Sequence, residues 1–354
     1  MTPPRSFGRL ARGAAVFAAA VPFAMCAPAP AYLMQAPASG PSYVSLTSTA
    51  PEVQNRAVSE HVIVISIDGL RADAIERADA ETLQRLMREG AYSLEARTIL
   101  PSITLPSHTS MLTGATPAMH GVDWNDERVE EEGVIQTPTM FAIARKAGYH
   151  TAAFFSKPKF QHLMAPGTLD YGQAPEGNGR WYAGYTAESV ERYLEDHRPN
   201  LLFVHFGEPD YAGHTIGWGT FVYRWAVRRA DGAAERVLRK ADEAFGEGNY
   251  TVIVTADHGG HGRTHGTDAE SDVTIPWIAW GKGVKPGVEL PEGIRTFDTA
   301  ATALGLLGLS LPPEHAGTPV RAAFTEPIAT PAYAGAAQEI PVVLPESTAV
   351  AASE

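Results

Sequence analysis

The sequence is poor in cysteine, in positive charge and in long apolar runs, and each shortage excludes a class of protein. The single cysteine, Cys26, excludes an internal disulfide framework and a zinc site built from thiolates. Lys and Arg number 28 against 40 acidic residues, so the formal charge is −12 and the basic stripe of a nucleic-acid groove is not expected. No apolar run is long enough to predict a transmembrane segment.

The remaining composition is typical of a globular protein. Hydrophobic residues make up 44% and aromatic residues 9% of the 354 positions, which is enough for a sizeable core. The length fits one large α/β domain or two smaller domains. Because the chain is acidic, an anionic substrate would need a local counter-charge, either a metal ion or a few placed cations.

The N-terminus predicts a secretory signal peptide over residues 1–31. It carries three arginines and no acid, then the apolar run GAAVFAAAVPFAM and an Ala-Pro-Ala site at 29–31. We therefore expect a periplasmic or secreted protein, with a disordered N-terminus as the alternative. A lipid anchor on Cys26 is not favoured, because Met25 is bulkier than the small residue that lipoprotein signals have before the cysteine.

The rest of the chain divides into a folded domain and two loose segments. Cleavage would leave a mature chain of charge −12 − 3 = −15 without cysteine, which suits an oxidising compartment. We expect a flexible linker over residues 32–56 and one domain over residues 57–327. Residues 328–354 are rich in Ala and Pro without helical periodicity, which predicts a disordered tail.

Strand and helix patterns alternate through the expected domain. The apolar run HVIVISIDGL stops at Asp68, as a buried parallel strand does, and a helical pattern then continues to Gly90. Segments 137–155, 186–206 and 231–260 each read as a helix, a turn and a strand. This alternation predicts an α/β fold with a mostly parallel central sheet and helices on both faces.

Polar residues follow four of the predicted strands, at Asp68, at Ser156-Lys157, at Glu208-Pro209-Asp210 and at Asp257-His258. Ligands of open α/β sheets bind beyond the carboxyl ends of the strands, so chemistry is expected there. Three aspartates and three histidines in these segments form a set of oxygen and nitrogen ligands suited to two divalent metals. They are Asp68, Asp210, His214, Asp257, His258 and His265.

Four motifs occur in a fixed order between about His61 and Pro319. They are VIVISIDGLRAD, TLPSHTSMLTGATPAMHGV, EPDYAGH and TADHGGHGRTHG, followed by FDTAATALGLLGLSLP. In this order they resemble the alkaline phosphatase superfamily, most closely its branch of nucleotide pyrophosphatases/phosphodiesterases and threonine-dependent phosphatases. The resemblance implies the alkaline-phosphatase-like sandwich fold and a metal-dependent phosphoesterase domain.

The resemblance also implies two metal sites, with zinc as the usual ion. One metal would be bound by Asp210, His214 and His265. The other would be bound by Asp68, Asp257 and His258, with the hydroxyl of Thr104 bridging toward it. His261 is an alternative to His265, although the dipeptide His-Gly after the Asp-His-Gly element favours His265.

Thr104 is expected to be the nucleophile and to form a phospho-threonine intermediate. A threonine hydroxyl is weakly nucleophilic at neutral pH, and no base lies near it in the sequence, so a metal would have to activate it. The second metal would stabilise the leaving oxygen. A helix predicted to begin near Ser107 would bring backbone amides to the phosphoryl group.

Three further residues are expected to contact phosphoryl oxygens. Asn125, which follows Thr104 by 21 residues, matches the family's asparagine donor, with a turn residue as the alternative. Lys157 and Lys159 resemble the paired cations with which threonine-dependent phosphatases hold a dianionic monoester, with a solvated surface pair as the alternative.

Six residues are given no chemical role. His108 and His120 are expected to support or pack around the site. Four aromatic residues at helical spacing are expected to be core rather than a leaving-group pocket; they are Trp218, Phe221, Tyr223 and Trp225.

These features predict a two-zinc hydrolase of small phosphoric esters. The favoured activity is that of a phosphodiesterase/nucleotide pyrophosphatase. The alternatives are an alkaline phosphomonoesterase that uses Lys157 and Lys159, a phosphoethanolamine-type transferase and, least favoured, a catalytically inactive binding protein. A sulfatase is not expected, because TLPSH has threonine where sulfatases have Cys or Ser and lacks their arginine. A phosphoglycerate mutase would need a serine nucleophile and a large second domain.

Overall fold

The computed structural model describes residues 57–176 and 179–329. The predicted signal peptide, the linker and all but the first two residues of the predicted tail lie outside these ranges. Within them, no helix combines the length and the apolar character that a membrane span requires.

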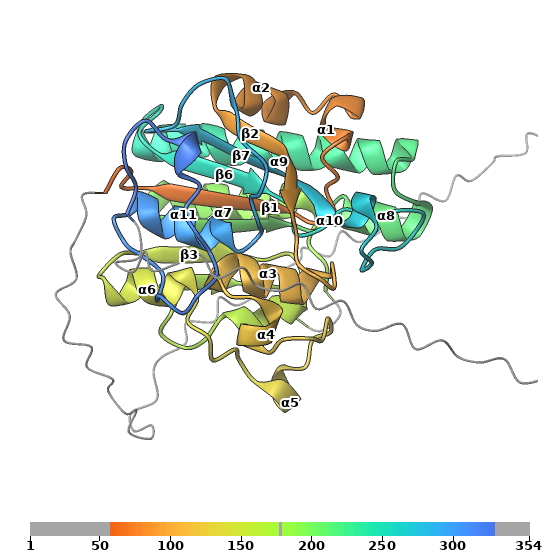
Figure 1. The fold of residues 1–354 in the computed structure, drawn as a ribbon, viewed down its shortest axis with the longest axis horizontal. Coiled ribbons are helices and arrows are strands. Elements are labelled where there is room, and N and C mark those ends of the chain that lie inside the picture. Colours follow the sequence, from red (N-terminus) through yellow and green to blue (C-terminus); the bar gives the residue numbers. More distant parts are fainter. Residues whose placement is uncertain (1–56, 177–178, 330–354) are drawn as a thin grey trace, which may run out of the picture. The chain divides into compact units, whose positions relative to one another are not determined.

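An eight-stranded sheet has the order β4-β3-β5-β1-β6-β7-β2-β8 (Figure 1). Its strands are β1 Val62–Ile67, β2 Ala91–Arg97, β3 Thr151–Phe154, β4 Tyr171–Gln173, β5 Leu201–Phe206, β6 Thr251–Thr255, β7 Thr274–Gly281 and β8 Val288–Glu289. The five strands from β4 to β6 are parallel, and β7 is antiparallel to both β6 and β2. The predicted mostly parallel α/β fold is confirmed, and the antiparallel β2–β7 pair is an addition that the sequence patterns did not predict.

Helices cover both faces of the sheet, with α2, α7 and α9 on one face and α3, α6 and α11 on the other (Figure 1). The helices are α1 Ala74–Arg77, α2 Glu81–Glu89, α3 Thr104–Thr113, α4 Pro117–His120, α5 Val129–Glu132, α6 Met140–Lys146, α7 Ala183–Asp196, α8 Asp210–Ile216, α9 Phe221–Phe245, α10 Glu270–Val273 and α11 Asp298–Leu306, with 3-10 turns at Pro158–Leu163 and Arg321–Ala323. The helical pattern before Gly90 forms two helices, because Asp79 between them has a positive φ of 51°.

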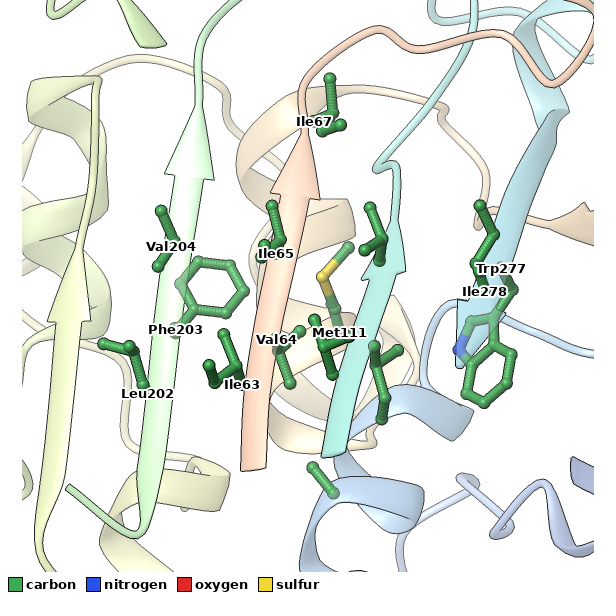
Figure 2. Close-up of a cluster of buried hydrophobic side chains, with 14 of the residues drawn as sticks. Ile63, Val64, Ile65, Ile67, Met111, Leu202, Phe203, Val204, Trp277 and Ile278 are labelled. Carbon is green, nitrogen blue, oxygen red and sulfur yellow. The ribbon is translucent and has the colours of Figure 1, made fainter. Parts of the chain in front are cut away.

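The central strands are apolar along their whole length because they are covered on both sides. All six residues of β1 and all six of β5 are buried. Figure 2 shows Ile63, Val64 and Ile65 of β1 between the neighbouring strands β5 and β6, with Met111 of α3 packed beside them.

The register of the sheet brings the four predicted polar strand ends to one edge. Ile67 at the end of β1 pairs with Phe206 at the end of β5, and Ser66 pairs with Thr255 at the end of β6. Strand β3 joins β5 at the same level. Because β3, β5, β1 and β6 are consecutive neighbours, the segments that follow them leave the sheet side by side.

Candidate active site

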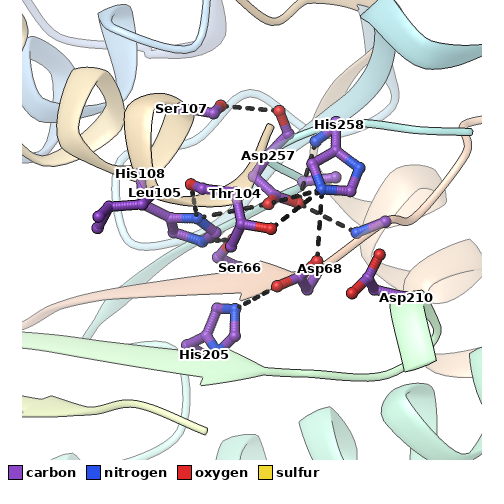
Figure 3. A network of polar contacts seen from close by, with 12 residues as sticks. Ser66, Asp68, Thr104, Leu105, Ser107, His108, His205, Asp210, Asp257 and His258 are labelled. Atoms are coloured by element: carbon purple, nitrogen blue, oxygen red, sulfur yellow. Dashed lines mark hydrogen bonds and ion pairs between the residues drawn. The ribbon is translucent and has the colours of Figure 1, made fainter. Parts of the chain in front are cut away.

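Two aspartates at this edge are completely buried and each keeps one carboxylate oxygen without a hydrogen-bond partner. Asp68 Oδ2 lies 2.7 Å from Lys157 Nζ and 3.0 Å from His205 Nε2, whereas Oδ1 has no partner. Asp257 Oδ1 accepts from the amides of Gly69 and His258 at 3.0 Å each, whereas Oδ2 has no partner (Figure 3). Both aspartates therefore have a free oxygen that could bind a metal.

A glycine turn after Asp68 brings the Asp210 segment against this pair. Gly69 has φ +72°, and a Cβ on it would lie 3.0 Å from Asp210 Cα. The Asp210 amide donates to the Asp68 carbonyl at 2.9 Å. Only glycine fits there, which places Asp210 directly beside Asp68.

The first metal set of the sequence analysis comes together. Asp210 begins α8, and His214 follows one turn later on the same face, with its Nε2 3.2 Å from Asp210 Oδ1. His265 Nε2 lies 3.1 Å from His214 Nε2, while its Nδ1 lies 2.8 Å from the carbonyl of Ser102. The ligand atoms of the three residues lie within 4.8 Å of one another. His261, the alternative to His265, instead contacts Asp272 Oδ1 at 2.7 Å.

Around the second predicted set a third aspartate, Asp210, also comes close. The ligand atoms of Asp68 and His258 lie within 4.8 Å of one another and of Asp210, so the group contains Asp210 rather than Asp257. Asp257 is adjacent, with Oδ2 3.2 Å from His258 Nε2. Asp210 thus stands between the two groups.

The charges of the site fit a divalent cation. Three buried carboxylates, those of Asp68, Asp210 and Asp257, meet the single buried ammonium of Lys157, which leaves two negative charges uncompensated. Burial, together with the charge of Asp68, raises the pKa of Asp257 well above its usual value, and a nearby cation would favour its charged form. Burial and His258 lower the pKa of His265 to about 4, which keeps this imidazole neutral, as a metal ligand must be.

Thr104 lies beside the second group, buried, with its Oγ1 3.4 Å from His258 Nε2 (Figure 3). It is the first residue of α3, so the helix begins three residues before the predicted start at Ser107. Pro106 is compatible with this early start, because an amide in the first turn has no partner within the helix. The amide of Leu105 donates to Asn125 Oδ1 at 2.9 Å, so this amide is not free for a phosphoryl group.

The two predicted phosphate-binding lysines have different surroundings. Lys157 is buried, with Nζ 2.7 Å from both Asp68 Oδ2 and Asp210 Oδ2; burial alone would lower its pKa, but these carboxylates raise it overall. Lys159 donates to Asn125 Oδ1 at 3.1 Å, and burial together with the charge of Lys157 lowers its pKa to about 8. The solvated-pair alternative is therefore wrong for Lys157.

A pocket opens at this edge beside Thr104. Its lining residues are Thr104, Asn125, Asp126, Glu127, Lys157, Pro158, Lys159, Gly179, Arg180, Asp210, Tyr211, His214 and His265. The sequence analysis missed Arg180 and Tyr211. The guanidinium of Arg180 and the ammonium of Lys157 each lie 5.1 Å from the Tyr211 ring centroid, so three pocket side chains form one cation–π group.

The sequence analysis also missed His205, which lies within the apolar strand β5. Its Nε2 contacts Asp68 Oδ2 at 3.0 Å and its Nδ1 contacts Ser156 Oγ at 2.7 Å. One polar residue in the run LLFVHF was the available signal, because a buried histidine needs partners for its ring nitrogens.

The histidines expected to have supporting roles do have protein partners. His108 Nδ1 lies 2.9 Å from the carbonyl of Thr104 and its Nε2 lies 2.8 Å from Ser66 Oγ. His120 Nε2 lies 3.0 Å from Ser110 Oγ.

The aromatic prediction is half right. Trp218 and Tyr223 are buried and both donate to the carbonyl of Gly69, at 3.1 and 2.9 Å. Phe221 and Trp225 are instead 67% and 47% exposed, so they are not core. None of the four lines the pocket.

The fold and its polar edge define an alkaline-phosphatase-like α/β protein. The family model "Type I phosphodiesterase / nucleotide pyrophosphatase" matches residues 62–268. The chain therefore belongs to this family, a branch of the alkaline phosphatase superfamily, as the motifs indicated.

Sequence similarity to individual proteins agrees with this family. The chain is 25% identical over 222 residues to human ectonucleotide pyrophosphatase/phosphodiesterase family member 1, covering 56% of this chain and 23% of that one. It is 24% identical over 316 residues to GPI ethanolamine phosphate transferase 1 of Candida glabrata, covering 74% of this chain and 33% of that one. The chain thus spans a third or less of the length of these two relatives.

A solved structure shares the fold. An inactive variant of murine ectonucleotide pyrophosphatase / phosphodiesterase 5, in complex with AMP, superposes with a TM-score of 0.63 at 16% identity. The match covers 73% of this chain and 98% of that chain.

Proposed function

We propose that the chain is a two-metal hydrolase of small phosphoric esters that acts through a covalent phospho-threonine at Thr104. One observation carries the proposal: three buried carboxylates, each with a free oxygen, and three imidazoles converge beside a buried hydroxyl. Such a donor set suits zinc, which takes nitrogen and oxygen ligands. Membership of a phosphodiesterase family supports the same reading.

The proposed metal ligands are Asp210, His214 and His265 for one ion, and Asp68, Asp257 and His258 for the other. The close approach of Asp210 to Asp68 and His258 supports a shared position for Asp210 between the ions. Bound zinc would lower the pKa of a hydroxyl and stabilise charge on the oxygens of an in-line displacement.

The chain's own residues hold the nucleophile and the ester. His108 donates from Nδ1 to the Thr104 carbonyl and, with the start of α3, fixes the position of the Thr104 hydroxyl. Thr104 Oγ attacks phosphorus and the bond from phosphorus to the leaving oxygen breaks; the proton that the hydroxyl loses balances the one that the leaving group gains, whether this is an alcohol from an ester or a phosphate from a pyrophosphate. Water then attacks the phospho-threonine, Thr104 Oγ regains a proton, and phosphate or a phosphate monoester is released. Asn125 Oδ1 is engaged by Leu105 and Lys159, so its Nδ2 would be the donor to a phosphoryl oxygen.

We propose phosphodiesters, including nucleotide pyrophosphates, as the substrate class. A diester presents one negative charge and a monoester two. The ammonium of Lys157 is engaged by two carboxylates, so it contributes little further charge to a monoester. A murine relative was solved with AMP, which supports a small phosphorylated ligand.

Two alternative activities are an alkaline phosphomonoesterase and a phosphoethanolamine-type transferase. An alkaline phosphomonoesterase would depend on Lys159, whose Nζ lies in the pocket near Asn125. A transferase would pass the phospho-threonine to an alcohol instead of water, and the similarity to GPI ethanolamine phosphate transferase 1 supports this option. Export to the periplasm or beyond, as the N-terminal sequence predicts, would place any of these activities outside the cytoplasm.

The experiment measures metal content and the rates on bis-p-nitrophenyl phosphate and p-nitrophenyl phosphate with the purified full chain. We expect about two zinc ions per chain, a higher kcat/KM for the diester, loss of activity with a chelator and recovery with zinc. A faster monoester rate that falls in Lys159→Ala would favour the phosphomonoesterase. A metal-free chain without either activity would overturn the proposed function.

A further inference from the structure

Exposed large hydrophobic side chains are concentrated on one side of the pocket. Of the eight in the described residues, six lie at the start of α7, at the end of α8 and in the first two turns of α9, whereas Leu100 and Met119 lie elsewhere. We call these six the α8–α9 patch: Tyr182, Tyr185, Ile216, Phe221, Val222 and Trp225. Single exposed apolar residues are common, but a concentration of them indicates an interaction surface.

The α8–α9 patch carries positive charge in an acidic protein. Residues 211–230 contain three arginines and no acid, although the chain has a formal charge of −12. Arg229 lies 4.9 Å from the ring centroid of Trp225 and 6.0 Å from that of Tyr182. Within the described residues Arg224 forms no ion pair. Arg228 forms one long pair, with Asp79 at 4.0 Å on the surface. Aromatic rings interleaved with arginine are typical of surfaces that lie in the headgroup layer of a membrane.

The patch is connected to the candidate active site by direct contacts. Arg229 pairs with Glu208 Oε1 at 3.2 Å, and Glu208 Oε2 accepts from the amide of Ala183 at 2.6 Å at the start of α7. Glu208 lies two residues before Asp210. Tyr182 of the patch contacts the pocket residue Tyr211 edge-on, with ring centroids 6.3 Å apart. Aromatic rings and arginine side chains therefore form a continuous series of contacts from the pocket to the α8–α9 patch.

We propose that the α8–α9 patch docks on a bilayer surface that contains anionic phospholipid, and that docking presents the pocket to the phosphate esters of lipids. The lipid substrate rests on the proposed function, whereas the docking does not. A second copy of the chain is the less favourable occupant. A symmetric dimer through the patch would bring Arg224 and Arg228 close to their own copies, whereas anionic lipid complements them.

Co-sedimentation of the full chain with phosphatidylcholine vesicles, with and without phosphatidylglycerol, tests the docking. We expect binding to the phosphatidylglycerol vesicles that weakens at high salt. The double change Phe221→Ser and Trp225→Ser should reduce this binding at least about tenfold, because the rings leave the interface. Arg224→Gln with Arg228→Gln should remove the dependence on anionic lipid and on salt.

Met119→Ser is the matched control, because Met119 is 41% exposed on α4 and outside the patch, so it should bind as the wild type does. All variants should hydrolyse soluble bis-p-nitrophenyl phosphate at the wild-type rate, which shows that they fold. The proposal is overturned if the wild type does not bind, if Met119→Ser loses as much binding, or if sedimentation shows a dimer that the double change dissociates. Vesicle binding without any diester hydrolysis would instead overturn the proposed function and leave the docking intact.

Discussion

The buried acids of this protein fall into two groups that differ in how their oxygens are satisfied. Seven acids are buried within residues 57–176 and 179–329. Four of them have a hydrogen-bond or ion-pair partner for each carboxylate oxygen; they are Glu208, Asp231, Asp272 and Asp298. The other three, Asp68, Asp210 and Asp257, each keep an oxygen without a hydrogen-bond partner.

The difference separates structural carboxylates from candidate ligands. Asp231 on α9, for example, accepts from the amides of Thr82 and Leu83 and so satisfies the first turn of α2. A buried carboxylate oxygen that lacks a hydrogen bond is costly, and instead of such a bond these three have a histidine Nε2 nearby, at 3.2 Å for Asp210 and Asp257 and at 3.6 Å for Asp68. Bound cations would satisfy them, so this group rather than the other forms the candidate active site.

The largest effect should come from the hydroxyl that the three unsatisfied acids surround. Thr104→Ala should lower diester hydrolysis by at least about 10³-fold, since removal of a nucleophile costs orders of magnitude. Both metals should remain bound, because no metal-set carboxylate or imidazole is changed. Thr104→Ser should retain part of the activity. Near-normal hydrolysis by Thr104→Ala would show that water attacks directly.

A matched pair of aspartate-to-asparagine changes tests the comparison itself. Asp210→Asn should weaken zinc binding by more than roughly 10²-fold, beyond the usual effect of residues that only orient ligands. Asp231→Asn should keep zinc but lose about 1–2 kcal/mol of stability, because the amide nitrogen would face a backbone donor of α2. Zinc titration of both variants measures the affinity, and urea unfolding measures the free energy of unfolding. If Asp231→Asn lost zinc instead, the division of the acids would be wrong.

Asp298 gives a pH test within the satisfied group. Burial raises the pKa of Asp298 to about 6, although the amides of Thr318 and Arg295 donate to it. Because the folded-state pKa is the higher one, its contribution to stability is full below about pH 4 and is lost as the pH rises toward about 6. The loss amounts to about 3 kcal/mol at most, at 1.36 kcal/mol per unit.

Across that range the wild type should therefore lose about 3 kcal/mol of unfolding free energy relative to Asp298→Asn, so that an advantage of about 1 kcal/mol near pH 4 becomes a disadvantage of about 2 kcal/mol above about pH 6. The variant also loses one hydrogen bond, because its amide nitrogen faces the Arg295 amide, but this loss of about 1 kcal/mol does not vary with pH. A difference between the two proteins that stays constant from pH 4 to about 6.5 would contradict the raised pKa.

The smallest effect should come from His205, which holds one oxygen of Asp68 and leaves the other free. His205→Leu should weaken zinc affinity by about 10- to 100-fold, as removal of a residue that orients a ligand does. His205→Gln should recover part of the affinity, since its amide can donate to Asp68. Equal zinc affinity in all three proteins would mean that Lys157 alone positions Asp68.

Local patterns were sufficient to predict the parallel strands of the sheet and the edge at which the candidate site lies. Apolar runs that end in Asp68, Asp210 and Asp257 identify buried parallel strands, and parallel strands place their carboxyl ends at one edge whatever their order. The spacing from Asp210 to His214 also predicts one face of a helix turn. These features depend on residues close in sequence, which is why they can be read from it.

The tertiary structure alone decided which of these side chains meet. Strand order placed Lys157, after β3, across β5 from Asp68, after β1, so that its ammonium lies between two carboxylates rather than in solvent. Two members of one aromatic set also differ: Tyr223 is covered by the Gly69 turn, whereas Phe221 is 67% exposed. Burial depends on what a distant segment packs against, and the periodicity of a single helix carries no information about that neighbour.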